Sequence, residues 1–276
     1  MPFNTPHTMP PAPLPPDIQQ EAIQAVQAYI GKAYEPGQLP PFLSTSLRSG
    51  SLPLLALIRI LGDYLTSEDE RIRSQGVQLL AQVVLDLSES ERHLFDKQSV
   101  KTLSAFFAEK VQDASNVAAS IARATNSSDK VVPATAPSYR VKAIPEGTEM
   151  LTATLQALTK LVHLDGFGSE QTQQVARAII NHTTPRDHPQ LVRFFIYGVI
   201  DALLAARRKS LKSMGKEFLK GYIQLAEGEK DPRNLMYLFA MDRVLLIEWE
   251  LDLELAEVST HDKQPETFVL LTRFPS

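Results

Sequence analysis

The most constraining feature of this sequence is a helical periodicity that runs through most of its length. Apolar residues recur at three- and four-residue intervals, and short polar or proline-bearing turns separate the periodic segments. The pattern predicts about nine helices, and no segment predicts a strand with comparable clarity. Because each amphipathic helix must bury its apolar face, and short turns place consecutive helices side by side, we expect an all-α protein of antiparallel helix pairs.

Helix pairs of this kind can pack in two ways. Stacked pairs form an α-solenoid, whereas pairs closed around one core form a helical bundle. Periodicity alone leaves both arrangements open, because the repeat is degenerate. At two helix starts, 69–73 and 231–233, an acid stands in the turn and an arginine in the first helical turn. This arrangement resembles the turn of HEAT-type repeats, so that a HEAT-type α-solenoid is the expected fold.

The extent of the periodic pattern sets the expected domain boundaries. Residues 1–16 contain seven prolines, which predict a disordered, polyproline-like arm. The helical-repeat domain is expected over 17–250, with a long surface loop at 113–147, where prolines and polar residues interrupt the period. Within this stretch, 114–125 could form a short alanine-rich helix. Residues 251–276 fit neither a helix nor a strand clearly, and we expect them to be the end of a truncated chain.

Composition narrows the range of functions. Lys and Arg number 28 against 32 Asp and Glu, so there is no basic excess for direct nucleic-acid binding. The absence of cysteine excludes thiolate ligation of zinc or of an iron–sulfur cluster by this chain, and it suits a reducing compartment. The longest apolar run, 194–206, is shorter than the roughly 20 residues of a membrane span. We therefore expect an intracellular protein that contacts no membrane.

The sequence contains no recognisable catalytic, cofactor or metal motif. The glycines at 166–168 lack a strand-to-helix context and are interpreted as a turn. His182 and His188 are accompanied only by Asp187, which is too few ligands for a metal site. The acids of 227–231 are interpreted as a helix end, a turn and an N-cap. We expect a protein that is not an enzyme and carries no cofactor.

A basic cluster at the end of the predicted helix 188–208 is the strongest local charge feature. Cations at a helix C-terminus complement the helix dipole, which gives the cluster a purely structural explanation. The alternative is a surface for an acidic partner. The candidate partner-binding residues are Arg207, Arg208, Lys209 and Lys212.

Two helix starts carry the residues expected to act as structural caps. Ser67 and Glu70 have the spacing of a capping box, in which each side chain bonds the backbone of the other residue. Asp231 precedes Pro232 and is expected to cap the next helix, with Arg233 beside it.

Four segments together resemble one known family. They are 61–66 running into the helix at 68–87, 106–113, 191–205 and 221–235. The most specific is Glu-Lys-Asp-Pro-Arg-Asn-Leu at 229–235. Together they resemble the N-terminal HEAT domain of the Mms-nineteen family of DNA repair and transcription regulators, over about residues 45–250.

The resemblance implies a function that composition does not reveal. Proteins of this family are adaptors in cytosolic iron–sulfur protein assembly, and they work with a WD40 propeller protein in a targeting complex. Their clients are iron–sulfur enzymes of replication and repair, including the TFIIH helicase. The resemblance therefore implies protein partners of this kind, in the nucleus and the cytoplasm. Family members are far longer, so this chain is expected to be a short or truncated member.

Two other classes of function remain as alternatives. A generic HEAT-type interaction module with an unrelated partner, such as a trafficking or transport adaptor, would share every structural feature predicted above. A helical-bundle enzyme would need several inward acids or histidines facing one cavity.

Overall fold

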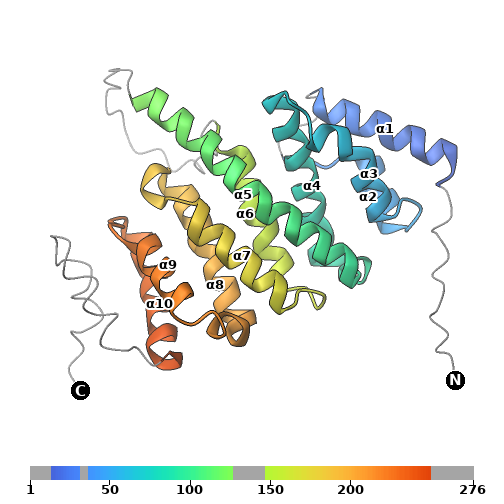
Figure 1. Cartoon of the computed structure of the whole chain (residues 1–276). Helices are drawn as coiled ribbons and strands as arrows, with labels where there is room; N and C mark the ends of the chain where they lie inside the picture. Colours follow the sequence, from blue (N-terminus) through green and yellow to red (C-terminus); the bar gives the residue numbers. More distant parts are fainter. Residues whose placement is uncertain (1–13, 32–36, 127–146, 250–276) are drawn as a thin grey trace, which may run out of the picture. The chain divides into compact units, whose positions relative to one another are not determined.

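The computed structural model describes residues 14–31, 37–126 and 147–249, and these residues confirm the all-α prediction (Figure 1). They form ten α-helices, two short 3-10 helices and no strand. The helices are α1 (Pro16–Ile30), α2 (Pro41–Arg48), α3 (Leu54–Leu65), α4 (Glu70–Ser90), η1 (Arg92–Leu94), α5 (Lys97–Asn126), α6 (Glu149–Val162), α7 (Ser169–His182), η2 (Pro185–Asp187), α8 (Gln190–Lys212), α9 (Lys216–Ala226) and α10 (Pro232–Glu248).

The chain divides into two compact units, and the division falls after Gly76, inside α4. In the N-terminal unit, α1 packs against both α2 and α3. The C-terminal unit contains the rest of α4 and every later described helix. The predicted domain over 17–250 thus spans both units.

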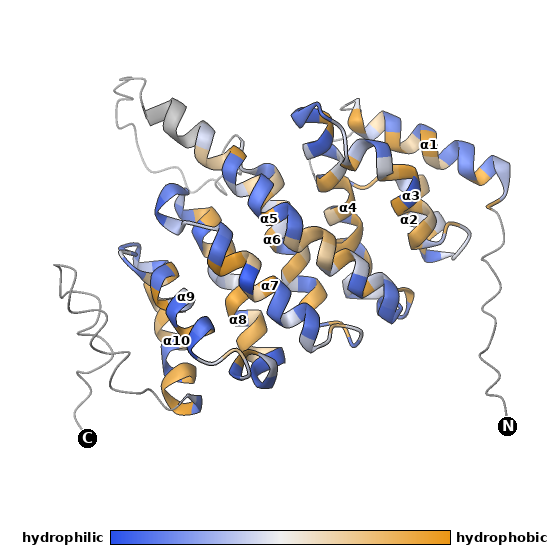
Figure 2. Ribbon diagram, viewed as in Figure 1, coloured by the Kyte–Doolittle hydropathy of each residue, from blue (hydrophilic) through white to orange (hydrophobic). Residues whose placement is uncertain are grey.

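The C-terminal unit is a stack of helix pairs in two layers (Figure 1). In one layer α5 packs against α7 and α7 against α9, while in the other α6 packs against α8 and α8 against α10. Contacts between α5 and α6, and between α7 and α8, join the layers. Hydrophobic and hydrophilic residues alternate along these helices, as two-layer packing requires (Figure 2).

Between successive pairs, the Arg193–Glu229 contact spans 36 positions and the Lys101–Glu170 contact spans 69, whereas several other side-chain contacts span 40 to 45. The latter join Arg177 to Glu217, Gln190 to Asn234, Arg207 to Val162 and Arg208 to Glu248. The N-terminal end of α8 contacts that of α10 through Gln190 and Asn234, and the C-terminal ends meet through Arg208 and Glu248. Helices α8 and α10, which belong to successive pairs, therefore run parallel. The separation of 40 to 45 positions lies in the range of about 40–47 residues typical of HEAT and armadillo repeats. These contacts support the solenoid, and the HEAT-type subclass stays a prediction.

Three segments differ from their predicted structure. Helix α5 continues to Asn126, so the loop does not begin at residue 113 and the alternative of an alanine-rich helix over 114–125 holds; this end of α5 buries Ala114 and Ala118. Helix α2 was not among the predicted elements; it begins at Pro41, and proline suits a first helical turn. Helix α1 begins at Pro16, one residue earlier than the predicted end of the arm allowed, and Asp17 lies in its first turn.

The remaining predictions about chain segments lie outside the described residues. These are the arm up to residue 13, the loop over 127–146 and the tail over 251–276.

Candidate functional site

A buried carboxylate lies in the turn between α9 and α10, within the motif that carries the family resemblance. Glu229 has a side chain that is only 1% exposed. An ionised carboxylate at such a depth is costly unless donors satisfy both of its oxygens. Its surroundings therefore decide whether it can take part in chemistry.

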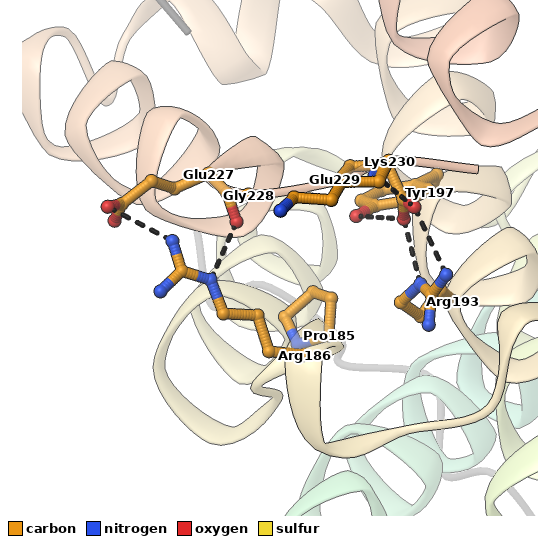
Figure 3. A pocket seen from close by; sticks show the side chains of 8 residues that line it. All are labelled: Pro185, Arg186, Arg193, Tyr197, Glu227, Gly228, Glu229 and Lys230. Carbon is orange, nitrogen blue, oxygen red and sulfur yellow. Dashed lines mark hydrogen bonds and ion pairs between the residues drawn. The ribbon is translucent and has the colours of Figure 1, made fainter. Parts of the chain in front are cut away.

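Both oxygens of Glu229 are saturated with donors (Figure 3). Oε2 accepts hydrogen bonds from Arg193 Nε at 2.8 Å, Asn234 Nδ2 at 3.0 Å and the Tyr197 hydroxyl at 3.1 Å. Oε1 accepts from Arg193 Nη2 at 3.1 Å and from the next two backbone N–H groups at 2.9 and 2.8 Å. We call Glu229, Arg193, Tyr197 and Asn234 the Glu229 clamp, since they fasten the α9–α10 turn to α8.

The clamp holds Glu229 in its ionised form. Burial by itself would raise the pKa of this carboxyl, but the hydrogen bonds from Arg193, the Asp231 N–H and Asn234 outweigh burial and lower the pKa to about 2. Burial, together with the negative charge of Glu229, raises the pKa of Tyr197 well above its ordinary value. A carboxylate that is fully hydrogen-bonded and this weakly basic does not serve as a general base at neutral pH.

A hollow of about 250 Å³ lies beside the clamp (Figure 3). On its other side Arg186 donates from Nε to the Glu227 carbonyl oxygen at 3.0 Å and forms an ion pair with the Glu227 carboxylate at 3.1 Å. Gly228 has φ of +74°, and a Cβ there would lie 2.7 Å from Arg186 Nε. Both carboxylates lining the hollow, Glu227 and Glu229, are thus engaged in ion pairs that shape the turn.

Arg207, the first residue of the predicted partner surface, is engaged within the chain. It lies at a kink in α8 with φ −131° and ψ 26°. Its guanidinium donates to the carbonyl oxygens of Val162 at 3.0 Å and Leu164 at 2.7 Å, and it lies over the ring of Phe167. Carbonyl groups at the end of a helix lack intrahelical partners, so Arg207 caps the C-terminus of α6. This geometry favours the structural explanation for Arg207.

Of the other three residues of the predicted surface, Arg208 is bonded within the chain, whereas Lys209 and Lys212 are exposed. Arg208 donates to the Leu204 carbonyl oxygen at 3.3 Å and to Glu248 Oε1 at 2.6 Å, which ties α8 to α10. Lys209 and Lys212 are exposed and form no ion pair with any residue that the structure describes. The surface available to an acidic partner is therefore centred on these two lysines.

The helix start at residue 70 is capped in a different way from the predicted one. Asp69 is the capping residue of α4, since its Oδ1 accepts from the backbone N–H groups of Arg71 at 2.9 Å and Ile72 at 3.3 Å. Ser67 Oγ instead accepts from the Asp69 N–H at 3.2 Å. The cap thus lies two residues later than expected, because Glu70 is already the first helical residue.

At the start of α10 the predicted residues lie together. Asp231 is the N-cap, and its Oδ1 accepts from the Arg233 backbone N–H at 3.0 Å. The Arg233 guanidinium also donates to both oxygens of Asp231, at 3.1 and 2.9 Å. Donors from Arg233 hold the pKa of Asp231 at about 2.

Sequence reasoning identified Glu229 only as a turn residue and did not find its partners Arg193 and Tyr197. A signal was present in the sequence: Arg193 and Tyr197 lie four positions apart in the apolar segment 191–200 of a helix, so they face the same side. A buried polar face on such a helix requires a partner.

No described part of the chain brings three or more metal-ligating side chains into one group. His182 is exposed, whereas His188 is buried beside Ser115, whose Oγ lies 3.1 Å from His188 Nε2. None of the described helices is long and apolar enough to cross a membrane.

Stacked helix pairs, joined by side-chain contacts and by a clamped turn, define an α-helical repeat protein. The sequence profile of one family matches residues 58–264, and its description reads "Dos2-interacting transcription regulator of RNA-Pol-II". Since the match covers most of the chain, the chain belongs to this family, and the predicted resemblance is confirmed. The match reaches beyond residue 250, where the resemblance was expected to end.

Curated relatives carry the same family identity. The chain is 27% identical over 197 residues to the "MMS19 nucleotide excision repair protein homolog" of Bos taurus and, equally, to that of Homo sapiens. These alignments cover 71% of this chain but only 16% of each relative. The "MMS19 nucleotide excision repair protein" of Drosophila melanogaster is 24% identical over 238 residues, which are 86% of this chain and 20% of that relative. The chain thus spans about a sixth to a fifth of its relatives' length.

Proposed function

We propose that this chain is a non-catalytic adaptor that binds proteins of DNA repair, replication and transcription. The observation that carries the proposal is the family match over residues 58–264. The names of the relatives, nucleotide excision repair proteins, support a role in repair, and the family description supports a role in transcription. Stacked helix pairs suit such a role, because they present long surfaces without a catalytic cleft.

The adaptor acts in iron–sulfur protein maturation, as the Mms-nineteen resemblance implies. It joins a targeting complex that contains a WD40 propeller protein, and it presents iron–sulfur client enzymes, including the TFIIH helicase, in the nucleus and the cytoplasm. Because the chain has no cysteine, it positions clients without supplying thiolate ligands to the cluster.

The mechanism is contact with an acidic partner surface through Lys209 and Lys212. These exposed lysines lie at the end of α8, where neighbouring arginines are engaged in structural contacts. Charges at such a position steer association and fix orientation more than they add affinity. The partner is therefore expected to carry Asp and Glu residues where it meets this end of α8.

Co-purification tests this function. The tagged full chain is recovered from its native cells, and the proteins that accompany it are identified by mass spectrometry against an untagged control. Recovery of the propeller protein or of iron–sulfur enzymes is expected. Recovery of neither, with unrelated transport or trafficking proteins enriched instead, would overturn the adaptor assignment in favour of a generic interaction module.

A further inference from the structure

Ser67, in the turn between α3 and α4, does not have the capping role that its sequence predicted. Asp69 caps α4 instead, so Ser67 and Glu70 do not bond each other's backbone. The Ser67 Oγ accepts one hydrogen bond, from the Asp69 N–H at 3.2 Å, and its own proton is donated to no described residue. Its neighbours Thr66 and residues 68–70 are exposed, so this hydroxyl group is available at the surface of the turn.

Three exposed acids directly follow Ser67. Glu68, Asp69 and Glu70 occupy the first, second and third positions after it. The Glu70 carboxylate forms no ion pair or hydrogen bond with a described residue. Acid-directed protein kinases select a serine of this kind, because basic residues of the kinase bind the carboxylates on its C-terminal side.

Ser88 shows that this spacing alone is not sufficient. Glu91 follows Ser88 at the same distance as Glu70 follows Ser67. However, Ser88 is only 4% exposed and lies inside α4, where its hydroxyl donates to the Leu85 carbonyl oxygen at 3.2 Å. A kinase must align the acceptor hydroxyl with the γ-phosphorus of ATP, so the folded protein offers Ser67 and withholds Ser88.

Arg73, in the first turn of α4, supplies a second and independent observation. Its Nη1 donates to the Ser67 carbonyl oxygen at 2.6 Å, which places the guanidinium beside Ser67. Its Nε is shielded from solvent and has no acceptor among the described residues. Since shielded donors are almost always paired, an acceptor is missing next to Ser67. The dipole of α4 also favours negative charge at this end of the helix.

We propose that Ser67 is a phosphorylation site for an acid-directed serine kinase. In the reaction, Ser67 Oγ attacks the γ-phosphorus of ATP, the bond from this phosphorus to the bridging oxygen of ADP breaks, and the hydroxyl proton passes to the catalytic aspartate of the kinase. The phosphate adds a charge of about −1.5 to −2 and three acceptor oxygens, and Arg73 Nε donates to one of them. Repulsion from the three acids turns the phosphate toward Arg73.

Phosphorylation of the folded full chain tests the site. The chain is incubated with casein kinase II and ATP, and peptide mass spectrometry follows Ser67 and Ser88 over time. Synthetic peptides over 60–76 and 81–97 serve as unfolded references. We expect Ser67 to be modified in the chain and in its peptide, and Ser88 in its peptide alone.

Glu70 is the matched substitution site, since its side chain has no partner among the described residues. Glu70→Gln should slow the phosphorylation of Ser67 several-fold, and Glu70→Asp should restore it. Circular dichroism of both variants should match that of the original chain, which separates recognition by the kinase from loss of the fold.

Phosphorus NMR tests the contact with Arg73. The second pKa of the phosphate, ordinarily about 6, should be lower in the phosphorylated chain than in the phosphorylated peptide. Both contain the three acids, but only the folded chain fixes Arg73 beside Ser67. Arg73→Gln should abolish the difference.

Three results would overturn the proposal. Ser67 could stay unmodified in the folded chain, whether or not its peptide reacts. Ser88 could react as fast as Ser67 in the folded chain, which would show that exposure in the turn does not select Ser67. Equal phosphate pKa values in chain and peptide would show that Arg73 does not bind the phosphate.

Discussion

Among individual residues, Glu229 ties α8 to the turn between α9 and α10. Substituting Glu229→Gln preserves its size but removes the charge that six donors surround. Because the substitution leaves Arg193 partly buried without a counter-charge, we expect a loss of about 3–5 kcal/mol in the free energy of unfolding, measured by urea denaturation.

Glu217→Gln is the matched control, since Glu217 pairs with Arg177 on the surface and its removal should change stability little. The pH dependence supplies a second check. The pKa of Glu229 is about 2 in the folded protein and about 4.5 ordinarily, so its stabilisation is complete above pH 4.5 and lost as the pH falls toward 2. The stability difference between Glu229→Gln and the original chain should shrink over that range; a constant difference would contradict the clamp.

His188 makes the free energy of unfolding depend on pH below 6.5, a range that begins at higher pH than that of Glu229. Burial lowers the pKa of His188 below its ordinary 6.5, with Asp187 opposing and Arg193 reinforcing the shift, and its Nδ1 has no described partner. As the pH falls, His188 of the unfolded chain therefore binds a proton before His188 of the folded protein does. The neutral, buried His188 thus stabilises the folded state fully above pH 6.5, and the free energy of unfolding declines as the pH falls below that value. We expect His188→Gln to flatten this part of the stability–pH curve, measured by thermal unfolding, whereas exposed His182→Gln should leave the slope unchanged.

At the scale of single residues, the sequence predicted local features better than distant ones. The cap at Asp231 could be inferred, because a cap and its acceptor groups lie within three residues of each other. The Glu229 clamp could not be, since Arg193 lies 36 positions away and the pairing depends on how two helix pairs stack. Arg207 likewise reaches Val162 across 45 positions, and its charge alone gave no indication of that contact.

Among the helices, α9 approaches α7 closely at Gly221. A Cβ at Gly221 would lie 2.7 Å from Cβ and Cδ1 of Ile180, which is closer than packed atoms tolerate. We expect Gly221→Ala to cost about 1–3 kcal/mol of stability through overpacking, measured by thermal or urea denaturation.

Gly198, in α8, is the control for that substitution. A Cβ there would meet no atom within 4 Å, so Gly198→Ala should stabilise the protein by about 0.5–1 kcal/mol through helix propensity alone. Equal effects at the two glycines would show that α9 does not lie against α7 as described.

Helix existence was predictable wherever the 3.6-residue period is strong, as it is in α6, α7 and α9. The misjudged segments share a cause, because single residues were weighed above the period. Helix α2 was missed although proline suits a first helical turn, and the loop was expected from 113 although the alanines that follow favour a helix.

For the whole molecule, the all-α fold was inferred from helix pairing, and within the C-terminal unit the stacked arrangement is supported by contacts between residues 40 to 45 positions apart. Function was not predictable from the period, because any helical-repeat protein would show it. Four sequence segments, among them the motif at 229–235, indicated the family, and in the structure Glu229 and Asp231 of this motif fix the turn from which α10 starts.

The adaptor function and its proposed surface are tested together by quantitative co-purification. The tagged chain is compared with two double variants that change net charge equally, Lys209→Glu with Lys212→Glu at the end of α8, and Lys97→Glu with Lys101→Glu on α5. We expect the first variant to lose most of the propeller protein and iron–sulfur enzymes that accompany the original chain, and the second to retain them. Equal recovery by all three chains, or recovery of none of these proteins by the original chain, would contradict the account.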